Sequence, residues 1–234
     1  MKKWLPLIVT LLLFLGTVWS PLQAATPKNA LVMAWQFDDI ITLDPAEIFE
    51  FSGAEYAGNT YDRLIGYAVE DVSKIYGVVA ESWTVGADGK TFTFKIRPGI
   101  RFASGNPLTA EDVAFSLQRT VILDKSPAFI LGQFGFTAAN VRDRIRATDP
   151  STVVLQTDKA YAPTFVLYCL TSTVGSVVDK KEVMAHEVDG DLGHAWLRTH
   201  HAGSGPFKLN QWKASELLLL DAHNDYWDGA PRMQ

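Results

Sequence analysis

The sequence predicts a globular fold of the mixed α/β or α+β class. Apolar residues make up 47% of the 234 residues and charged residues 20%, a balance that supports a sizeable core. Short stretches with alternating apolar and polar residues, typical of strands, are interspersed with stretches whose apolar residues recur at helical spacing. Both kinds of element are therefore expected within the chain.

The first 24 residues are expected to form a secretion signal that is not part of the fold. Lys2 and Lys3 precede an apolar run over residues 5–19, and Ala24 is small enough to precede a cleavage site. The run is shorter than the roughly 20 apolar residues that span a membrane. The alternative is an uncleaved N-terminal anchor.

Net charge and cysteine content limit the partners and the cellular location that can be expected. Cleavage would change the net charge from -5 to -7, and no basic patch predicts a nucleic-acid partner. Cys169 is the only cysteine, so neither an intramolecular disulfide nor lipid attachment near the cleavage site is expected. We therefore expect a freely moving protein in the periplasm, monomeric when full length.

The clearest local pattern lies between residues 82 and 123. Residues 82–85 and 91–97 predict a hairpin, because two glycines and an aspartate occupy the loop between them. Thr109 is expected to cap a helix together with Asp112. The apolar face of that helix is expected at Ala110, Val113, Ala114, Leu117 and Val121. The aromatic residues expected in the core are Trp83, Phe92, Phe94 and Phe102.

Shorter patterns predict the remaining elements. Strands are expected over residues 30–35, 152–157, 207–212 and 217–221. Helices are expected over residues 55–64, 163–170 and 180–186, the second beginning with a proline in its first turn.

Several motifs, taken in order, resemble bacterial solute-binding protein family 5, the periplasmic receptors of peptide- and nickel-type ABC transporters. The matching residues are Thr42-Leu43-Asp44-Pro45, Tyr61-Asp62-Arg63-Leu64, Trp83, Asp88-Gly89-Lys90-Thr91, Phe94, Arg97-Pro98-Gly99, Phe102, Gly105, Pro107 to Val113, Phe115-Ser116, Gly203-Ser204-Gly205-Pro206-Phe207, Asn224-Asp225-Tyr226-Trp227, Gly229 and Pro231.

The resemblance implies a two-lobed fold of the periplasmic-binding-protein type II class. Family members are much longer, so the chain is expected to hold only part of that fold, with the second lobe missing. By the family pattern, residues 25–50 and 202–234 belong to the first lobe, and residues 51–201 form an accessory domain.

The implied function is delivery of di- or oligopeptides to an ABC permease in the inner membrane, without catalysis or a cofactor. In such receptors the peptide backbone pairs with extended protein segments. The alternatives are an exported peptide chaperone or a partner of a membrane sensor with the same fold, and, less favoured, an exported hydrolase.

Two segments are candidates for ligand contact. The resemblance points to Glu50, Phe51 and Ser52, and an ordinary surface loop is the alternative there. The apolar, glycine-containing segment 129–136 is a second candidate, with Gln133 and Phe134 facing the solute. A buried core segment is the favoured alternative for residues 129–136.

Two further patterns are interpreted as structural. His186, His194, His200 and His201 lie close in sequence, but glycines interrupt any helix that would align them, so no metal site is expected. Ser204 lies between two glycines, but the segment lacks the Gly-x-Ser-x-Gly spacing of a nucleophile elbow.

Overall fold

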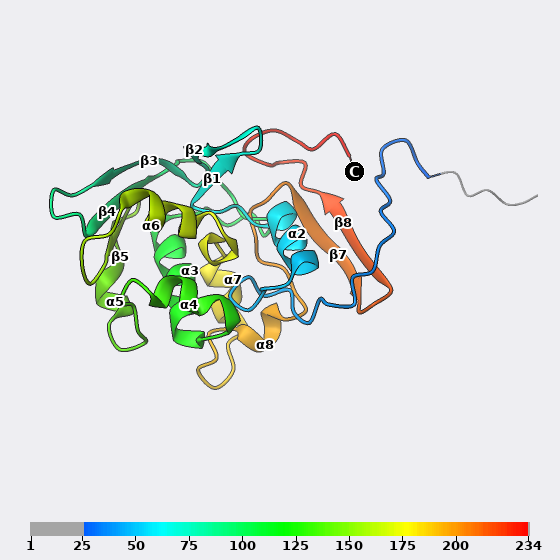
Figure 1. The fold of residues 1–234 in the computed structure, drawn as a ribbon. Coiled ribbons are helices and arrows are strands. Elements are labelled where there is room, and N and C mark those ends of the chain that lie inside the picture. Colours follow the sequence, from blue (N-terminus) through cyan, green and yellow to red (C-terminus); the bar gives the residue numbers. More distant parts are fainter. Residues whose placement is uncertain (1–25, 234) are drawn as a thin grey trace, which may run out of the picture. The chain divides into compact units, whose positions relative to one another are not determined.

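The computed structural model describes residues 26–233. The chain divides into two compact units, residues 1–33 and residues 34–234. In the first, described residues 26–33 have no helix or strand, and the expected secretion signal lies outside the described residues. Every named element belongs to the second unit (Figure 1). No described helix is both long and apolar enough to cross a membrane.

The second unit contains helices and strands throughout its length (Figure 1). The helices are α2 (Phe51–Thr60), α3 (Ala110–Leu123), α4 (Phe129–Gly132), α5 (Val141–Arg144), α6 (Pro163–Leu170), α7 (Lys180–Ala185) and α8 (His194–Leu197). The strands are β1 (Ile65–Ala68), β2 (Asp71–Gly77), β3 (Ala80–Val85), β4 (Thr91–Ile96), β5 (Ile145–Asp149), β6 (Thr152–Gln156), β7 (Phe207–Lys213) and β8 (Leu217–Ala222).

A four-stranded antiparallel sheet in the order β3-β4-β6-β5 supports the larger core. The predicted hairpin is confirmed as β3 and β4, with Val85 opposite Phe92. Phe92 and Phe94 are fully buried, and Trp83 packs against the same core while partly exposed. The alternation of the sequence therefore correctly identified the face of the sheet that is covered.

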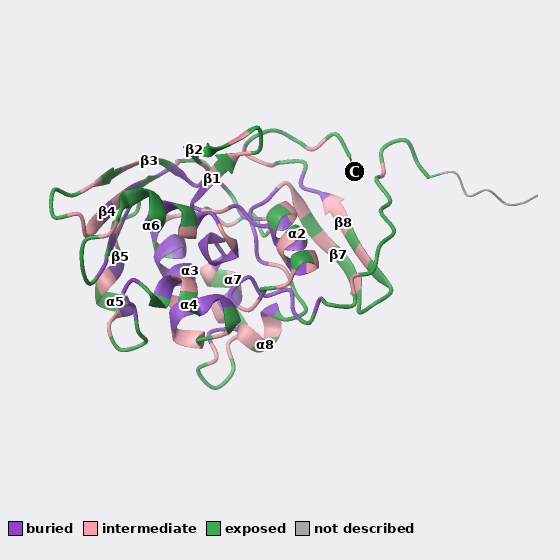
Figure 2. Ribbon diagram, viewed as in Figure 1, coloured by how far each residue is buried: buried purple, intermediate pink, exposed green. Residues whose placement is uncertain are grey.

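Helix α3 packs against β5 and β6, and its predicted cap is confirmed. The backbone N–H and the hydroxyl of Thr109 both donate to Asp112 Oδ2, each over 2.8 Å. The helix contributes to both hydrophobic clusters of the second unit. One cluster lies around the sheet and α6, and the other joins α2, α7 and α8 to the inner side of the β7–β8 hairpin. Figure 2 shows the buried stretches of α3 between these elements.

Some predicted elements are wrong in place or extent. Residues 30–35 form no strand, because no described segment pairs with them and an extended segment needs a partner for its backbone hydrogen bonds. The helix expected over 55–64 spans Phe51–Thr60 instead. The apolar residues after it, Tyr61 and Leu64, are buried but lie outside the helix, which the helical spacing did not distinguish.

A buried ion pair links the turn at residues 42–45 to α3. Arg119 donates from Nη1 and Nη2 to the two carboxylate oxygens of Asp44 over 2.7 and 2.6 Å. Its Nε also donates to the carbonyl of Leu192 over 2.8 Å. Both side chains are almost completely buried, at 1% and 0% exposure. The aspartate of the Thr42-Leu43-Asp44-Pro45 motif therefore holds this turn against the helix.

A second buried carboxylate, Asp62, brings together three segments that are far apart in the sequence. It accepts hydrogen bonds from the Ser204 hydroxyl, the Tyr226 hydroxyl and the Trp227 indole N–H, over 2.9, 2.8 and 2.9 Å. Asp62 is 4% exposed, and burial raises the pKa of its carboxyl group, while these donors act in the opposite direction. We call these four residues the Asp62 clasp.

Candidate functional site

Several exposed aromatic side chains lie on or beside α2, α4 and α6. Phe49 and Phe129 meet edge to face, with ring centroids 5.6 Å apart, and are 58% and 59% exposed. Phe165 and Tyr168 lie one turn apart on α6 and are 43% and 37% exposed. Gln133, at the end of α4, donates to Cys169 Sγ of α6 over 3.5 Å and so links the two helices.

We call Phe49, Phe51, Phe129, Phe165 and Tyr168 the aromatic surface. Large apolar side chains that cluster in contact with water often mark a binding surface. Figure 2 shows exposed residues on α2, α4 and α6. The side chains of the aromatic surface belong to these helices or to residues next to them. The proline at position 163 and the apolar run after it predicted α6 but could not indicate which of its apolar residues stay exposed.

The first predicted segment lies at the start of α2, directly after Phe49. Phe51 is 94% exposed, and the Ser52 backbone N–H donates to Asp39 Oδ2 over 3.5 Å. Glu50 Oε2 accepts from the Phe49 N–H over 3.0 Å. The other oxygen of Glu50 is buried and has no hydrogen-bond partner among the described residues. The Phe49–Phe129 contact thus brings the two segments chosen from the sequence to one place.

The two residues predicted in the second segment differ in exposure. Gln133 is exposed, whereas Phe134 is 1% exposed and packs edge to face on Tyr161 and Phe165. Phe134 therefore offers no surface to a solute in this structure, and the buried-core alternative describes it. A single apolar segment supplies both core and surface because α4 is only one turn long.

The histidines have structural partners. The rings of His186 and His200 both stack on the indole of Trp196, with centroid distances of 4.3 and 4.7 Å. His194 Nε2 lies 2.8 Å from Glu47 Oε2. Among residues 26–233 no group of histidine, cysteine or acidic side chains is arranged to hold a metal ion.

Ser204, the residue considered as a nucleophile, is fully buried within the Asp62 clasp. Its flanking glycines pack on the backbone of Thr60. A Cβ on Gly203 would lie 2.1 Å from the Thr60 carbonyl oxygen, and one on Gly205 would lie 2.5 Å from the Thr60 carbonyl carbon. The two glycines on either side of Ser204 therefore allow this segment to pack closely on the backbone of Thr60.

His201 predicts a measurable pH dependence of stability. Burial lowers its pKa from the ordinary 6.5 to about 4, and its Nε2 lies 3.0 Å from the Thr60 carbonyl oxygen. Because the unfolded chain takes up this proton at a higher pH than the folded chain does, stability falls as the pH drops from 6.5 towards 4. We expect this side chain to contribute about 1–2 kcal/mol of that loss, allowing for its partial exposure.

Urea unfolding at a series of pH values, with wild type and His201→Asn compared, measures this contribution. Asparagine retains an N–H donor but does not titrate, so the difference between the two free energies of unfolding should change over this pH window. His200→Asn, at an exposed histidine, is the control and should leave the profile unchanged. A His201→Asn profile parallel to wild type would contradict the assignment.

The chain matches a family model and several known proteins. The family model described as bacterial extracellular solute-binding proteins, family 5 (middle), matches residues 74–234. A probable D,D-dipeptide-binding periplasmic protein, DdpA of Escherichia coli, is 30% identical over 239 residues, which cover 100% of this chain and 44% of the relative. The glutathione-binding protein GsiB of Escherichia coli is 27% identical, with 90% of this chain and 38% of the relative covered.

Solved structures give the same result. MoaA of A. tumefaciens, a periplasmic binding protein in complex with mannopinic acid, superposes with a TM-score of 0.70 at 25% identity, covering 83% of this chain and 37% of that one. DppA of Helicobacter pylori, in complex with the peptide STSA, gives a TM-score of 0.68 at 25% identity, covering 82% and 39%. The chain thus spans less than half the length of these relatives.

Proposed function

Because the chain belongs to the bacterial extracellular solute-binding proteins of family 5, we propose that it acts in solute capture for an ABC importer. The match of residues 74–234 to the family carries this proposal. Di- or oligopeptides are the proposed cargo, since relatives are named for a D,D-dipeptide and for glutathione, and DppA was solved with a peptide. The proposed partner is an inner-membrane permease, and the proposed location is the periplasm.

The proposed division of the chain follows the family pattern. Residues 25–50 and 202–234 are assigned to the first lobe and residues 51–201 to the accessory domain. The Asp62 clasp supports this division, because it joins the beginning of the accessory segment to the return segment through three side-chain hydrogen bonds.

The aromatic surface is the proposed place of solute contact. Exposed rings such as Phe51 and Phe129 can cover apolar side chains of a peptide while its backbone stays hydrated. Ser52 and Gln133 are exposed or partly exposed beside them, and we propose that they hydrogen-bond to peptide groups. Glu50, which directly precedes α2, is proposed as a further polar contact.

Saturation-transfer NMR detects such contacts even when binding is weak. We expect magnetisation transfer from the chain to trialanine and to glutathione at millimolar ligand, and none to mannitol. Phe51→Ser and Phe129→Ser should each weaken peptide binding about fivefold, because each removes one aromatic contact.

Val188→Ser is the matched control, since Val188 is 58% exposed but does not belong to the aromatic surface. It should leave peptide binding unchanged. Absence of transfer to both peptides, or an equal loss in the Val188 variant, would count against the proposed site. Mass spectrometry of solutes that co-purify with the protein from its periplasm tests the cargo class independently, and a defined sugar without peptides would refute it.

A further inference from the structure

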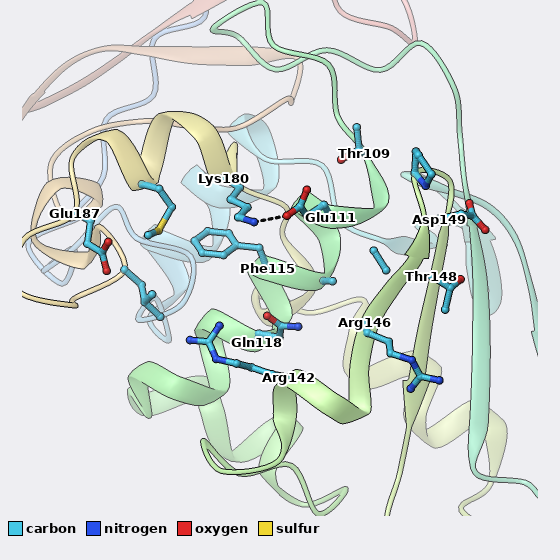
Figure 3. Close-up of a pocket in the computed structure, with 15 residues that line it drawn as sticks. Thr109, Glu111, Phe115, Gln118, Arg142, Arg146, Thr148, Asp149, Lys180 and Glu187 are labelled. Atoms are coloured by element: carbon cyan, nitrogen blue, oxygen red, sulfur yellow. Dashed lines mark hydrogen bonds and ion pairs between the residues drawn. The ribbon is translucent and has the colours of Figure 1, made fainter.

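A pocket of about 850 Å³ lies between α3, α7 and the α5–β5 segment (Figure 3). Helix α3 supplies Glu111, Ala114, Phe115 and Gln118, whose spacing of three and four residues places them on one helix face. β5 is an edge strand of the four-stranded sheet, and its residues 146–149 line the pocket. No residue of the aromatic surface lines the pocket, which makes it a different site from the one proposed for peptides.

One wall of the pocket is apolar. Ala114, Phe115 and Leu192 are 4%, 7% and 9% exposed, and their remaining accessible atoms lie at this wall. Met184 of α7 adds a flexible thioether next to them. Such a wall can cover an aromatic or hydrocarbon group of a ligand.

Only some of the charged side chains that line the pocket form ion pairs. Lys180 forms an ion pair with Glu111, and its ammonium group lies 5.9 Å from the centre of the Phe115 ring. Figure 3 shows this pair on one side of Phe115, with Gln118 and Arg142 on the other. The lysine and the glutamate therefore largely neutralise each other.

Two arginines, Arg142 and Arg146, also line the pocket. Among the ion pairs of the described residues, none includes Arg142 or Arg146. Arg146 Nη1 donates to the Asp143 carbonyl over 3.0 Å, which leaves its other N–H groups available. Asp149 nearby accepts hydrogen bonds from the Ser151 N–H and hydroxyl, each over 2.8 Å. Its carboxylate is therefore already held within its own turn.

We propose that this pocket binds a small organic anion. Its carboxylate or phosphate group would lie at Arg142, whose guanidinium lies beside Gln118 (Figure 3), because a planar guanidinium presents paired N–H donors that match either anion. Its apolar part would lie on the wall formed by Ala114 and Phe115. Glu187 lines the α7 end of the pocket (Figure 3), so its charge disfavours an anionic group bound at that end.

Titration of three related compounds into the whole chain tests this site. Phenylacetate and phenyl phosphate share an aromatic ring with phenylacetamide, which is neutral. By calorimetry or NMR shift perturbation, we expect saturable binding of the anions, at least about tenfold tighter than binding of the amide. Tighter binding of phenyl phosphate than of phenylacetate identifies phosphate as the recognised group, and the reverse order identifies carboxylate.

Variants then locate the binding. Arg142→Gln should weaken anion binding about tenfold or more, since it removes the charged donor. Arg146→Gln should weaken it less, because the Arg146 guanidinium points away from that of Arg142 (Figure 3). Arg144→Gln is the matched control: Arg144 belongs to the same helical turn, does not line the pocket and donates to the Gln156 carbonyl over 3.5 Å. All three substitutions are at or near the surface, and circular dichroism confirms that each variant is folded.

Three results would overturn the proposal: no saturable binding of either anion, binding of phenylacetamide as tight as that of phenylacetate, or an equal loss in Arg144→Gln. Phe51→Ser, which alters the proposed peptide site, should leave anion binding unchanged. Loss of anion binding in Phe51→Ser would show that the two sites are one, and would also overturn the proposal.

Discussion

Arg119→Ala is expected to lower the free energy of unfolding by about 3–5 kcal/mol, because it leaves the carboxylate of Asp44 buried without its partner. Asp44 is fully buried, and both of its oxygens accept from the guanidinium. The Leu192 carbonyl loses its donor in the same variant. Asp44→Ala should cost a similar amount, since it leaves the buried guanidinium unpaired. Urea unfolding followed by tryptophan fluorescence measures both changes.

Replacing both members of the pair separates the charge effect from the packing effect. The double variant Asp44→Asn with Arg119→Met removes both charges and keeps most of the volume, so it should lose less stability than the sum of the two alanine variants. Lys74→Ala is the control, because Lys74 and Asp71 form an exposed ion pair and its loss should leave stability unchanged. Equal losses of stability in Arg119→Ala and Lys74→Ala would show that the buried pair contributes no more to stability than an exposed pair.

Gly203→Ala is expected to lower the free energy of unfolding by about 3 kcal/mol or more. A methyl group there would lie 2.1 Å from the Thr60 carbonyl oxygen and 2.8 Å from Tyr61 Cδ1. The nearest obstacle is backbone, which cannot rotate away as a flexible side chain can. The return segment would have to shift, and the Ser204 hydroxyl would then leave Asp62.

Gly58→Ala is the matched control for this substitution. Gly58 lies in α2, and the nearest atom to an added Cβ is a guanidinium nitrogen of Arg63 at 3.6 Å. Alanine is a better helix residue than glycine, so stability should rise by about 0.5–1 kcal/mol. Thermal unfolding of the two variants therefore should move the midpoint in opposite directions. A neutral Gly203→Ala would show that the contact with Thr60 is looser than the structure indicates.

Much of the fold was predictable where periodicity and local chemistry agree. The β3–β4 hairpin, the cap of α3 and the helix beginning at Pro163 depend on contacts within a few residues, and the structure confirms them. The β1–β2 hairpin and strand β5 were missed, because their exposure pattern has no consistent apolar face. Tyr61 and Leu64 misled the helix prediction, because burial alone does not determine backbone conformation.

The candidate site was predicted only in part. Phe51 and Gln133 came from a family resemblance and from an apolar segment, and the structure brings these segments together through Phe49 and Phe129. Whether they bind solute stays a prediction. The pairing of Asp44 with Arg119 and the convergence of three motifs on Asp62 depend on residues far apart in the chain. A single sequence contains no signal for such contacts.

The Asp62 clasp has a consequence for the way this chain could change over evolutionary time. The Thr60 carbonyl, just before Asp62, accepts a hydrogen bond from the N–H of Gly205, just after Ser204, over 3.1 Å. The two ends of the stretch between them therefore lie side by side. We expect loops within that stretch to tolerate changes in length, because hydrogen bonds to the Asp62 carboxylate hold its two ends together.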